Sequence, residues 1–374
     1  MQSRFIHRYG INVLLVLLLF MPCFGIFACQ EVPIEVDNSK EDNSNEDNPK
    51  EEEVINVPHY YFENNYLDNR IAVINDAIKE CSDNREVFFW ITDIHWEEKF
   101  NARQAPVLIK YIASKTGLDM ILNGGDTADS KEVCEDAIAH LKEAIGSNKV
   151  YTVTGNHEIV NASSYENPFA RVADAIRSHN TDVLFGDNDR SYFYFDNTDN
   201  KVRYVGLASF GYYHDKKCDS CYTPEQLEWF TNTALNVEPG WTIIIFTHSI
   251  YAVSCATDKM YTSPVGADDF IAAIDNYHGN GTIACVLIGH THRDRIHIGN
   301  TGVPYIISAS DRYYPYQDDI NVSRVPGTIS EQHFEVFVMD KEKREIKLFS
   351  IGANARDGYD NEPGEEVDVR VVNY

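Results

Sequence analysis

The chain has 374 residues and a formal net charge of −26 at pH 7, which is long enough for one large domain or two small ones. So acidic a chain lacks the basic surface that a general nucleic-acid binder needs, so nucleic acid is not an expected partner. A small phosphorylated substrate is not excluded, because bound metal ions would supply positive charge locally.

The N-terminus predicts export. The first 28 residues read as a signal peptide, with Arg4 and Arg8 ahead of a short apolar run at 11–20. Ala28 precedes Cys29, an arrangement similar to the lipobox of bacterial lipoproteins, in which the cysteine is lipidated and becomes the mature N-terminus. We therefore expect a lipid on Cys29 and an anchor on a bacterial membrane, facing the periplasm or the cell surface. Ordinary cleavage near Ala28, which gives a secreted product, is the alternative.

Residues 29–56 are the expected tether. After Cys29 the segment is rich in Asn, Asp, Glu, Ser and Lys and almost free of large apolar residues, so it cannot bury enough surface to fold. The folded domain is predicted to span residues 57–374.

Helical and strand-like patterns alternate from residue 57 onward. Apolar residues at helical spacing predict helices at 67–81, 102–114, 131–145, 170–178, 223–235 and 267–277. Apolar runs predict strands at 87–92, 120–123, 150–154, 191–195, 202–209, 241–247, 283–288, 305–308, 334–339 and 345–351. Such alternation is typical of an α/β architecture, and the strand-rich tail indicates a second or mixed sheet.

Side chains that bind metals follow five of these strands, at the point where each strand ends. They are Asp93 and His95, Asp126 after two glycines, Asn156 and His157, His248, and finally His290 and His292. In α/β sheets the site lies at the carboxyl ends of the strands. The five motifs are therefore expected to meet at one end of the fold.

Each motif alone can be interpreted as purely structural. A strand-end Asp or Asn usually caps a helix or forms a turn, and a lone His is usually a hydrogen-bonded core group. Five consecutive strand ends with such residues make coincidence a poor explanation. Carboxylate and imidazole together favour a borderline metal ion. Asp126 has two oxygens with which to bridge two cations, and His157 is a candidate acid.

The ordered motifs DxH, GGD, GNHE, a lone His and GHTH resemble those of the calcineurin-like metallophosphoesterase superfamily over residues 87–292. The resemblance implies an α/β fold, a metallophosphoesterase-type sandwich of mixed β-sheets flanked by helices. It also implies two divalent metal ions. One would be held by Asp93, His95, Asp126 and His292, and the other by Asp126, Asn156, His248 and His290.

The resemblance further implies a phosphoric ester hydrolase, in which a hydroxide that bridges the metals attacks phosphorus. His157 would protonate the leaving group or stabilise the charged transition state, and Asp126 would bridge the ions. Asp126 could also orient His157, or Glu158 could tune the site. Monoester and diester substrates both stay open. The alternatives are a phosphodiesterase or nuclease acting on larger substrates, and a non-catalytic metal-binding protein on the same fold.

Asp129 marks a departure from one branch of this superfamily. It stands three residues after Asp126, where purple acid phosphatases have a tyrosine metal ligand. A tyrosinate–ferric centre is therefore not expected, and Mn, Zn or Fe(II) remain as candidates.

Candidates to contact the substrate are Arg312 and Tyr313, in a loop after the predicted strand 305–308. The arginine could hold a phosphate and the tyrosine could stack on a base or sugar. Ordinary surface or core positions are the competing interpretation. No pattern indicates a protein partner.

Overall fold

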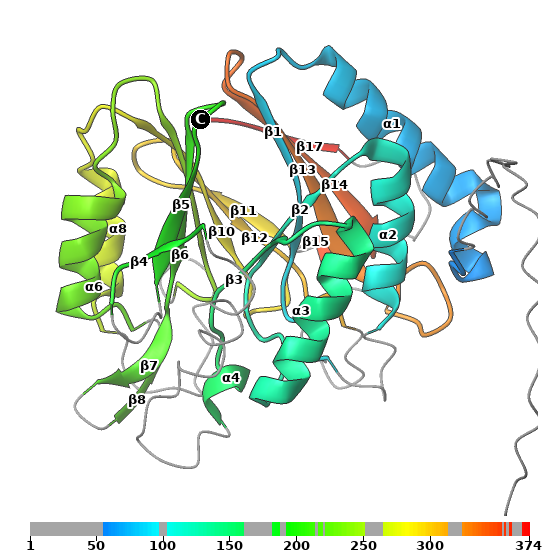
Figure 1. Ribbon diagram of the computed structural model, residues 1–374, viewed down its shortest axis with the longest axis horizontal. Coiled ribbons are helices and arrows are strands. Elements are labelled where there is room, and N and C mark those ends of the chain that lie inside the picture. The colour runs from blue at the N-terminus through cyan, green and yellow to red at the C-terminus, as the bar shows by residue number, and fades with distance from the viewer. Residues whose placement is uncertain are drawn as a thin grey trace, which may run out of the picture. The chain divides into compact units, whose positions relative to one another are not determined.

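Two β-sheets, with helices on their outer faces, form the centre of the fold in the computed structural model (Figure 1). The structure describes residues 55–96, 103–160, 182–187, 192–213, 216–219, 221–250, 265–312, 324–353, 355–356, 359–360 and 369–374. All of these residues belong to one compact unit, Glu53–Tyr374.

The first sheet has the strand order β17-β14-β13-β1-β2-β3. Its strands are β1 (Arg85–Ile91), β2 (Met120–Asn123), β3 (Lys149–Thr152), β13 (His333–Asp340), β14 (Glu345–Gly352) and β17 (Val369–Asn373). β1, β2 and β3 run parallel, whereas β13, β14 and β17 pair antiparallel. The sheet is therefore mixed, and its parallel half carries the first three sequence motifs.

The second sheet has the order β11-β12-β10-β9-β6-β5-β4. Its strands are β4 (Leu184–Phe185), β5 (Phe193–Asn197), β6 (Val202–Leu207), β9 (Thr242–Thr247), β10 (Thr282–Ile288), β11 (Arg295–Ile298) and β12 (Pro304–Ile307). The central strands β6, β9, β10 and β12 are parallel, and the outer strands are antiparallel. The last two motifs follow β9 and β10.

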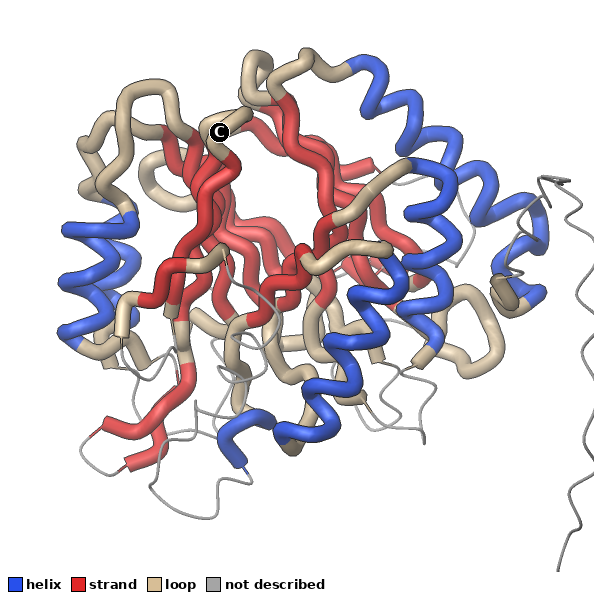
Figure 2. Tube along the Cα trace, viewed as in Figure 1, coloured by secondary structure: helices blue, strands red, loops and turns tan. Residues whose placement is uncertain are grey.

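Helices cover the outer face of each sheet (Figure 2). The first sheet is covered by α1 (Tyr66–Glu80), which follows the 3₁₀ segment η1 (His59–Asn65), and by α2 (Gln104–Thr116) and α3 (Lys131–Ile145). The second is covered by α6 (Pro224–Trp229), the π-helical turn η3 (Phe230–Ala234) and α8 (Ala267–Asp275). The short elements are α4 (His157–Val160) and the two-stranded pairs β7 (Phe210–Tyr213) with β8 (Lys216–Asp219) and β15 (Ala355–Arg356) with β16 (Tyr359–Asp360).

Aromatic side chains fill the space between the two sheets. Phe88 of β1 contacts Tyr204 of β6 at a ring-centroid distance of 5.9 Å, and Tyr151 of β3 stacks on Phe195 of β5 at 3.6 Å. β9 is buried along its whole length because it faces aromatic side chains on one side and helices on the other. Its continuous apolar sequence, TIIIFT, is what such a position requires.

The fold class predicted from the sequence is confirmed: two mixed sheets flanked by helices. One predicted helix, 223–235, is in fact divided into α6 and the π-helical turn η3. The predicted helix 170–178 lies outside the described residues. Within the described part of the chain, no helix combines the length and the apolar character needed to span a bilayer.

Candidate metal centre

Five residues of the site have left-handed backbone conformations. Asp93, His95, Asp126, His290 and His292 have φ values of 53°, 45°, 51°, 71° and 56°. Non-glycine residues rarely adopt this region, although Asp and His tolerate it better than most. Such strain persists only where the surrounding structure enforces it, and it concentrates at functional sites.

Backbone hydrogen bonds join the loop that follows β1 to the loop that follows β2. Beyond the last paired residues of β1 and β2, the amide of Asp93 donates to Gly125 O at 2.9 Å and the amide of His95 donates to Asp126 O at 2.9 Å. The parallel pairing therefore continues past the strands. It fixes where the Asp93, His95 and Asp126 side chains leave the backbone.

The Glu158 carboxylate holds the loop from its other side. It accepts hydrogen bonds from the amides of Asp126, Thr127, Ala128 and Gly155 at 3.1, 2.5, 3.2 and 2.6 Å. Successive amides that converge on one anion form a concave anion-binding arrangement. Glu158 is buried, so its carboxylate holds these four amides in place from the interior of the protein.

Two glycines let the ligand carboxylates approach the backbone closely. A Cβ atom on Gly155 would lie 2.2 Å from Asp126 Oδ1, and one on Gly289 would lie 2.6 Å from Asp93 Oδ2. Any side chain at these positions would displace a carboxylate. This explains why a glycine precedes each of the motifs Asn156-His157 and His290-Thr291-His292.

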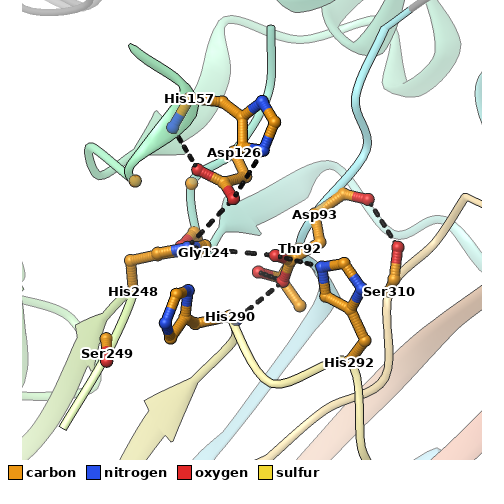
Figure 3. Close-up of polar contacts among 12 residues, drawn as sticks. Thr92, Asp93, Gly124, Asp126, His157, His248, Ser249, His290, His292 and Ser310 are labelled. Atoms are coloured by element: carbon orange, nitrogen blue, oxygen red, sulfur yellow. Dashed lines mark hydrogen bonds and ion pairs between the residues drawn. The ribbon is translucent and has the colours of Figure 1, made fainter. Parts of the chain in front are cut away.

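One potential ligand group consists of Asp93, His95 and His292, whose ligand atoms all lie within 4.8 Å of one another. Asp93 Oδ1 is 3.0 Å from His292 Nε2, and Asp93 Oδ2 accepts from the amide of His290 at 2.9 Å (Figure 3). Asp93 and His95 follow β1 of the first sheet, whereas His292 follows β10 of the second. The group is thus assembled across the two sheets.

A second group consists of Asp126, His248 and His290, with ligand atoms again within 4.8 Å. His248 Nδ1 lies 2.7 Å from Gly124 O, so this nitrogen carries the proton that is donated to the carbonyl. His248 Nε2 is thereby turned toward Asp126 Oδ2, at 3.3 Å (Figure 3). This orientation by a backbone carbonyl is usual for metal-binding histidines.

The two groups adjoin each other. His248 Nε2 is 3.8 Å from Asp93 Oδ1, and a further potential ligand group joins His95, Asp126 and His157. Asn156 is 5% exposed, and its side-chain oxygen accepts no hydrogen bond from the described residues. A buried carbonyl oxygen of this kind is costly unless something binds it. The donor set therefore fits divalent metal ions.

Burial and mutual attraction shift the pKa values of these groups. Burial alone would raise the pKa of Asp93 and of Asp126, yet neighbouring histidines, His292 and His248 above all, hold both well below the usual value. Burial lowers the pKa of His95 to about 3. Burial would also lower the pKa of His248, but Asp126 and Asp93 raise it to about 10. Without a bound metal, His248 therefore carries a proton whose positive charge faces the two carboxylates. A bound cation would replace that proton.

His157 stands at the edge of this cluster. Its amide donates to Asp126 Oδ1 at 2.8 Å, and its Nε2 is 3.9 Å from Asp126 Oδ2. Its Nδ1 lies 2.7 Å from Asp129 Oδ1. The side chain is 37% exposed, in contrast to the buried Asp126, so it is accessible to a ligand that the metals hold.

Asp129 is a site residue that the sequence did not reveal. Its position three residues after Asp126 predicts only the absence of a tyrosine ligand. The available signal was its spacing of three residues from Asp126 in a loop that leads directly into the helix starting at Lys131. The structure thus places Asp129 against His157 Nδ1, while Asp126 accepts the hydrogen bond of the His157 amide.

Three further predicted residues are Arg312, Tyr313 and Cys29. Arg312 is buried, at 5% exposure, and its carbonyl accepts from the Ser310 hydroxyl at 3.1 Å. The same hydroxyl donates to Asp93 O at 2.8 Å, so the backbone of Arg312 lies beside the Asp93 loop. Tyr313 and Cys29 lie outside the described residues.

Comparisons with known proteins match the chain to one family. The model of the calcineurin-like phosphoesterases matches residues 87–294, a span that includes every predicted metal ligand. No curated protein matches the chain by sequence. The fold is similar to a dimetal phosphatase from Danio rerio, at 14% identity and a TM-score of 0.43, covering 77% of this chain and 98% of that one.

Two further solved structures are similar to the chain. A phosphopantetheinyl hydrolase from Mycobacterium tuberculosis has 11% identity and a TM-score of 0.39, with 60% of this chain and 89% of that chain covered. A 5'-nucleotidase from Candida albicans has 14% identity and a TM-score of 0.39, with 76% and 50% covered.

Proposed function

The chain belongs to the calcineurin-like phosphoesterase family, and we propose that it hydrolyses phosphate esters at a centre of two divalent metal ions. The observation that carries this proposal is the pair of adjoining ligand groups, Asp93–His95–His292 and Asp126–His248–His290. Asp126 belongs to the second group and also approaches His95 of the first. It is therefore the residue that we assign to bridge the ions, with Asn156 completing the set.

The donor atoms favour borderline or moderately hard cations. Imidazole nitrogens and carboxylate or amide oxygens together suit Mn, Zn and Fe(II), and no thiolate is among the ligands. When bound, such ions activate a water molecule and neutralise charge on the phosphoryl oxygens.

The protein's own residues handle the leaving group. Attack by water on phosphorus breaks the bond to the leaving oxygen, which then needs a proton. His157 is the exposed histidine beside the ligands, and its Nε2 is the nitrogen not engaged by Asp129. Burial opposes protonation of His157, but Asp126 and Asp129 raise its pKa, which favours the imidazolium form that donates a proton. We assign His157 as the general acid.

The substrate class follows from the charge of the protein. A net charge of −26 disfavours long polyanions, so we propose a small phosphorylated molecule rather than nucleic acid. Positive charge in the site would come from the bound ions.

We further propose that the enzyme acts outside the cytoplasm, anchored by a lipid on Cys29. The support is the sequence of the first 29 residues together with the acidic tether up to residue 56. A lipid on Cys29 would keep the domain that follows the tether near a membrane.

An assay of hydrolysis after removal and return of metal tests the proposed function. The protein is stripped with a chelator and supplied with Mn²⁺, Zn²⁺, Fe²⁺ or Mg²⁺ against p-nitrophenyl phosphate and bis-p-nitrophenyl phosphate. We expect turnover only after a metal is returned, and the ratio of the two rates assigns monoester or diester chemistry. Stoichiometric metal binding without turnover of these esters, or of a library of phosphorylated metabolites, would contradict it in favour of a non-catalytic metal-binding protein.

A further inference from the structure

The proposed metal centre depends on how the two sheets are placed against each other. Asp93 and Asp126 follow strands of the first sheet, whereas His248, His290 and His292 follow strands of the second. A small shift of one sheet would separate carboxylates from histidines. Some interaction near the site must therefore fix the relative position of the sheets.

A buried chain of polar contacts crosses between the sheets close to the site. Trp90 Nε1 of β1 donates to Ser308 Oγ at 2.7 Å, just beyond β12 of the second sheet. Ser308 Oγ donates in turn to Glu335 Oε2 of β13 at 3.0 Å. The Arg370 guanidinium of β17 contacts both Glu335 and Asp294. We call these five residues the inter-sheet bridge.

Burial restricts how far the side chains of the inter-sheet bridge can move. Trp90 and Glu335 are fully buried, Ser308 and Asp294 are 2% and 3% exposed, and the Arg370 side chain is 9% exposed. A buried carboxylate that loses its partner is strongly destabilised, so these groups tolerate little displacement. The planar guanidinium can serve two carboxylates at once, which a single ammonium group cannot do with the same geometry.

The bridge adjoins the metal ligands at two points. Asp294 is two residues beyond His292 in the loop after β10. On the other side, Ser310 lies two residues after Ser308, and its hydroxyl donates to Asp93 O at 2.8 Å (Figure 3). The bridge thus reaches both the histidine loop of the second sheet and the Asp93 loop of the first.

The alternative interpretation of these buried groups is that they bind a metal ion. Asp294, His333 and Glu335 have ligand atoms within 4.8 Å of one another and are buried. However, the Arg370 guanidinium already contacts both carboxylates as their cation. His333 Nδ1 lies 2.6 Å from Ala353 O, and burial lowers the pKa of His333 to about 3, so the ring is neutral and Arg370 supplies the positive charge at the two carboxylates.

We propose that Arg370, through Asp294 and Glu335, is a positioning residue that sets the alignment of the two sheets on which metal binding depends. The proposal rests on the proposed function for the existence of the metal centre. Arg370 lies beyond residues 87–294, the part of the chain that the family model matches. The C-terminal edge strand β17 would thus belong to the catalytic unit.

The test compares two buried arginines in the full chain. Arg370→Met removes the charge of the bridge. Arg203→Met is the matched control, because Arg203 pairs with Asp196 at 2.8 Å through two nitrogens, near the start of β6 and away from its carboxyl end at the site. Mn²⁺ affinity is measured by calorimetry, Co²⁺ coordination by visible absorption, and Tm by circular dichroism.

We expect both substitutions to lower Tm, but only Arg370→Met to weaken Mn²⁺ binding, by roughly 10–100-fold, and to change the Co²⁺ spectrum. Arg370→Lys is expected to recover part of the affinity. Unchanged Mn²⁺ affinity and Co²⁺ spectrum in Arg370→Met would overturn the proposal, because the bridge would then only stabilise the fold. If Arg370→Met does not fold, Glu335→Gln provides the same comparison with a side chain of equal shape.

Other outcomes separate this proposal from the proposed function. Wild-type protein that binds Mn²⁺ but hydrolyses no phosphate ester would contradict the proposed function, while loss of affinity in Arg370→Met would still support the bridge. Wild-type protein that binds no metal would overturn both. An additional metal equivalent that disappears in Glu335→Gln would show that the three buried residues hold a metal, and would overturn the bridge.

Discussion

Asp129 Oδ1 lies 2.7 Å from His157 Nδ1 and so determines which nitrogen of the ring faces the metal ligands. In this contact Nδ1 carries a proton and donates it as a hydrogen bond to the Asp129 carboxylate. Nε2, which lies 3.9 Å from Asp126 Oδ2, is left to transfer a proton to the leaving group. A histidine held in this way has one orientation and one useful proton, which is what a general acid needs.

Replacing Asp129 with Asn is expected to move the pH profile of turnover. Asp126 and Asp129 raise the pKa of His157 against the opposing effect of burial. A general acid works in its protonated form, so kcat falls as pH rises through this pKa. Loss of the Asp129 charge lowers the pKa, and the alkaline limb of the kcat profile should shift to lower pH. An alkaline limb at the wild-type position would show that His157 is not the titrating acid.

His157→Ala should reduce turnover without removing the metals. Loss of a positioned general acid typically costs about 10²–10⁴ in rate. The loss should be larger with phenyl phosphate than with p-nitrophenyl phosphate, because nitrophenolate leaves without needing a proton. Rates with both esters and metal content by elemental analysis check this. Loss of metal would instead make His157 a ligand or a structural residue. Equal losses with the two esters and unchanged metal content would contradict its role as general acid and favour stabilisation of the charged transition state.

Glu158→Gln should loosen the loop that carries Asp126. Four amides donate to the Glu158 carboxylate, and a glutamine amide presents only one oxygen to accept them. Each buried donor left unsatisfied costs about 1–3 kcal/mol, so we expect a lower Tm and a weaker affinity for metal. Calorimetric titration with Mn²⁺ measures the affinity. Wild-type affinity in Glu158→Gln would mean that the backbone pairing with β1 holds the loop by itself.

Cys29→Ser should release the protein from membranes. The serine cannot carry a thioether-linked lipid, and the acidic tether has no apolar segment to replace it. Fractionation of cells that express the full chain, followed by detection in membrane and soluble fractions, is the measurement. Retention of Cys29→Ser in the membrane fraction would count against the lipid anchor.

The sequence predicted the parts of this protein that depend on local patterns. Strands such as β9 are continuous apolar runs because both faces are covered, and the candidate ligand side chains stand directly after them. Their order along the chain was therefore sufficient to predict both the fold class and the set of side chains that the structure brings together.

Such local patterns do not predict contacts between segments that are distant in the sequence. Asp294 and Glu335 meet Arg370 only because β17 pairs with β14, and no local spacing encodes that. β11 and β17 are short edge strands of four and five residues, and neither was predicted. Glu158 was visible in its motif, but its four amide partners follow from the left-handed turn at Asp126.

The most direct test of the two-metal proposal is a Mn²⁺ titration of metal-free protein, with p-nitrophenyl phosphate or its diester as substrate, for wild type and Asp126→Asn. We expect hydrolysis by wild type to rise as the second equivalent binds, because both ligand groups are needed. Asp126→Asn should bind Mn²⁺ more weakly at both places and hydrolyse neither ester. Wild-type turnover by Asp126→Asn, or full activity of wild type with a single equivalent, would contradict the assignment of Asp126 as the bridge of a two-metal centre.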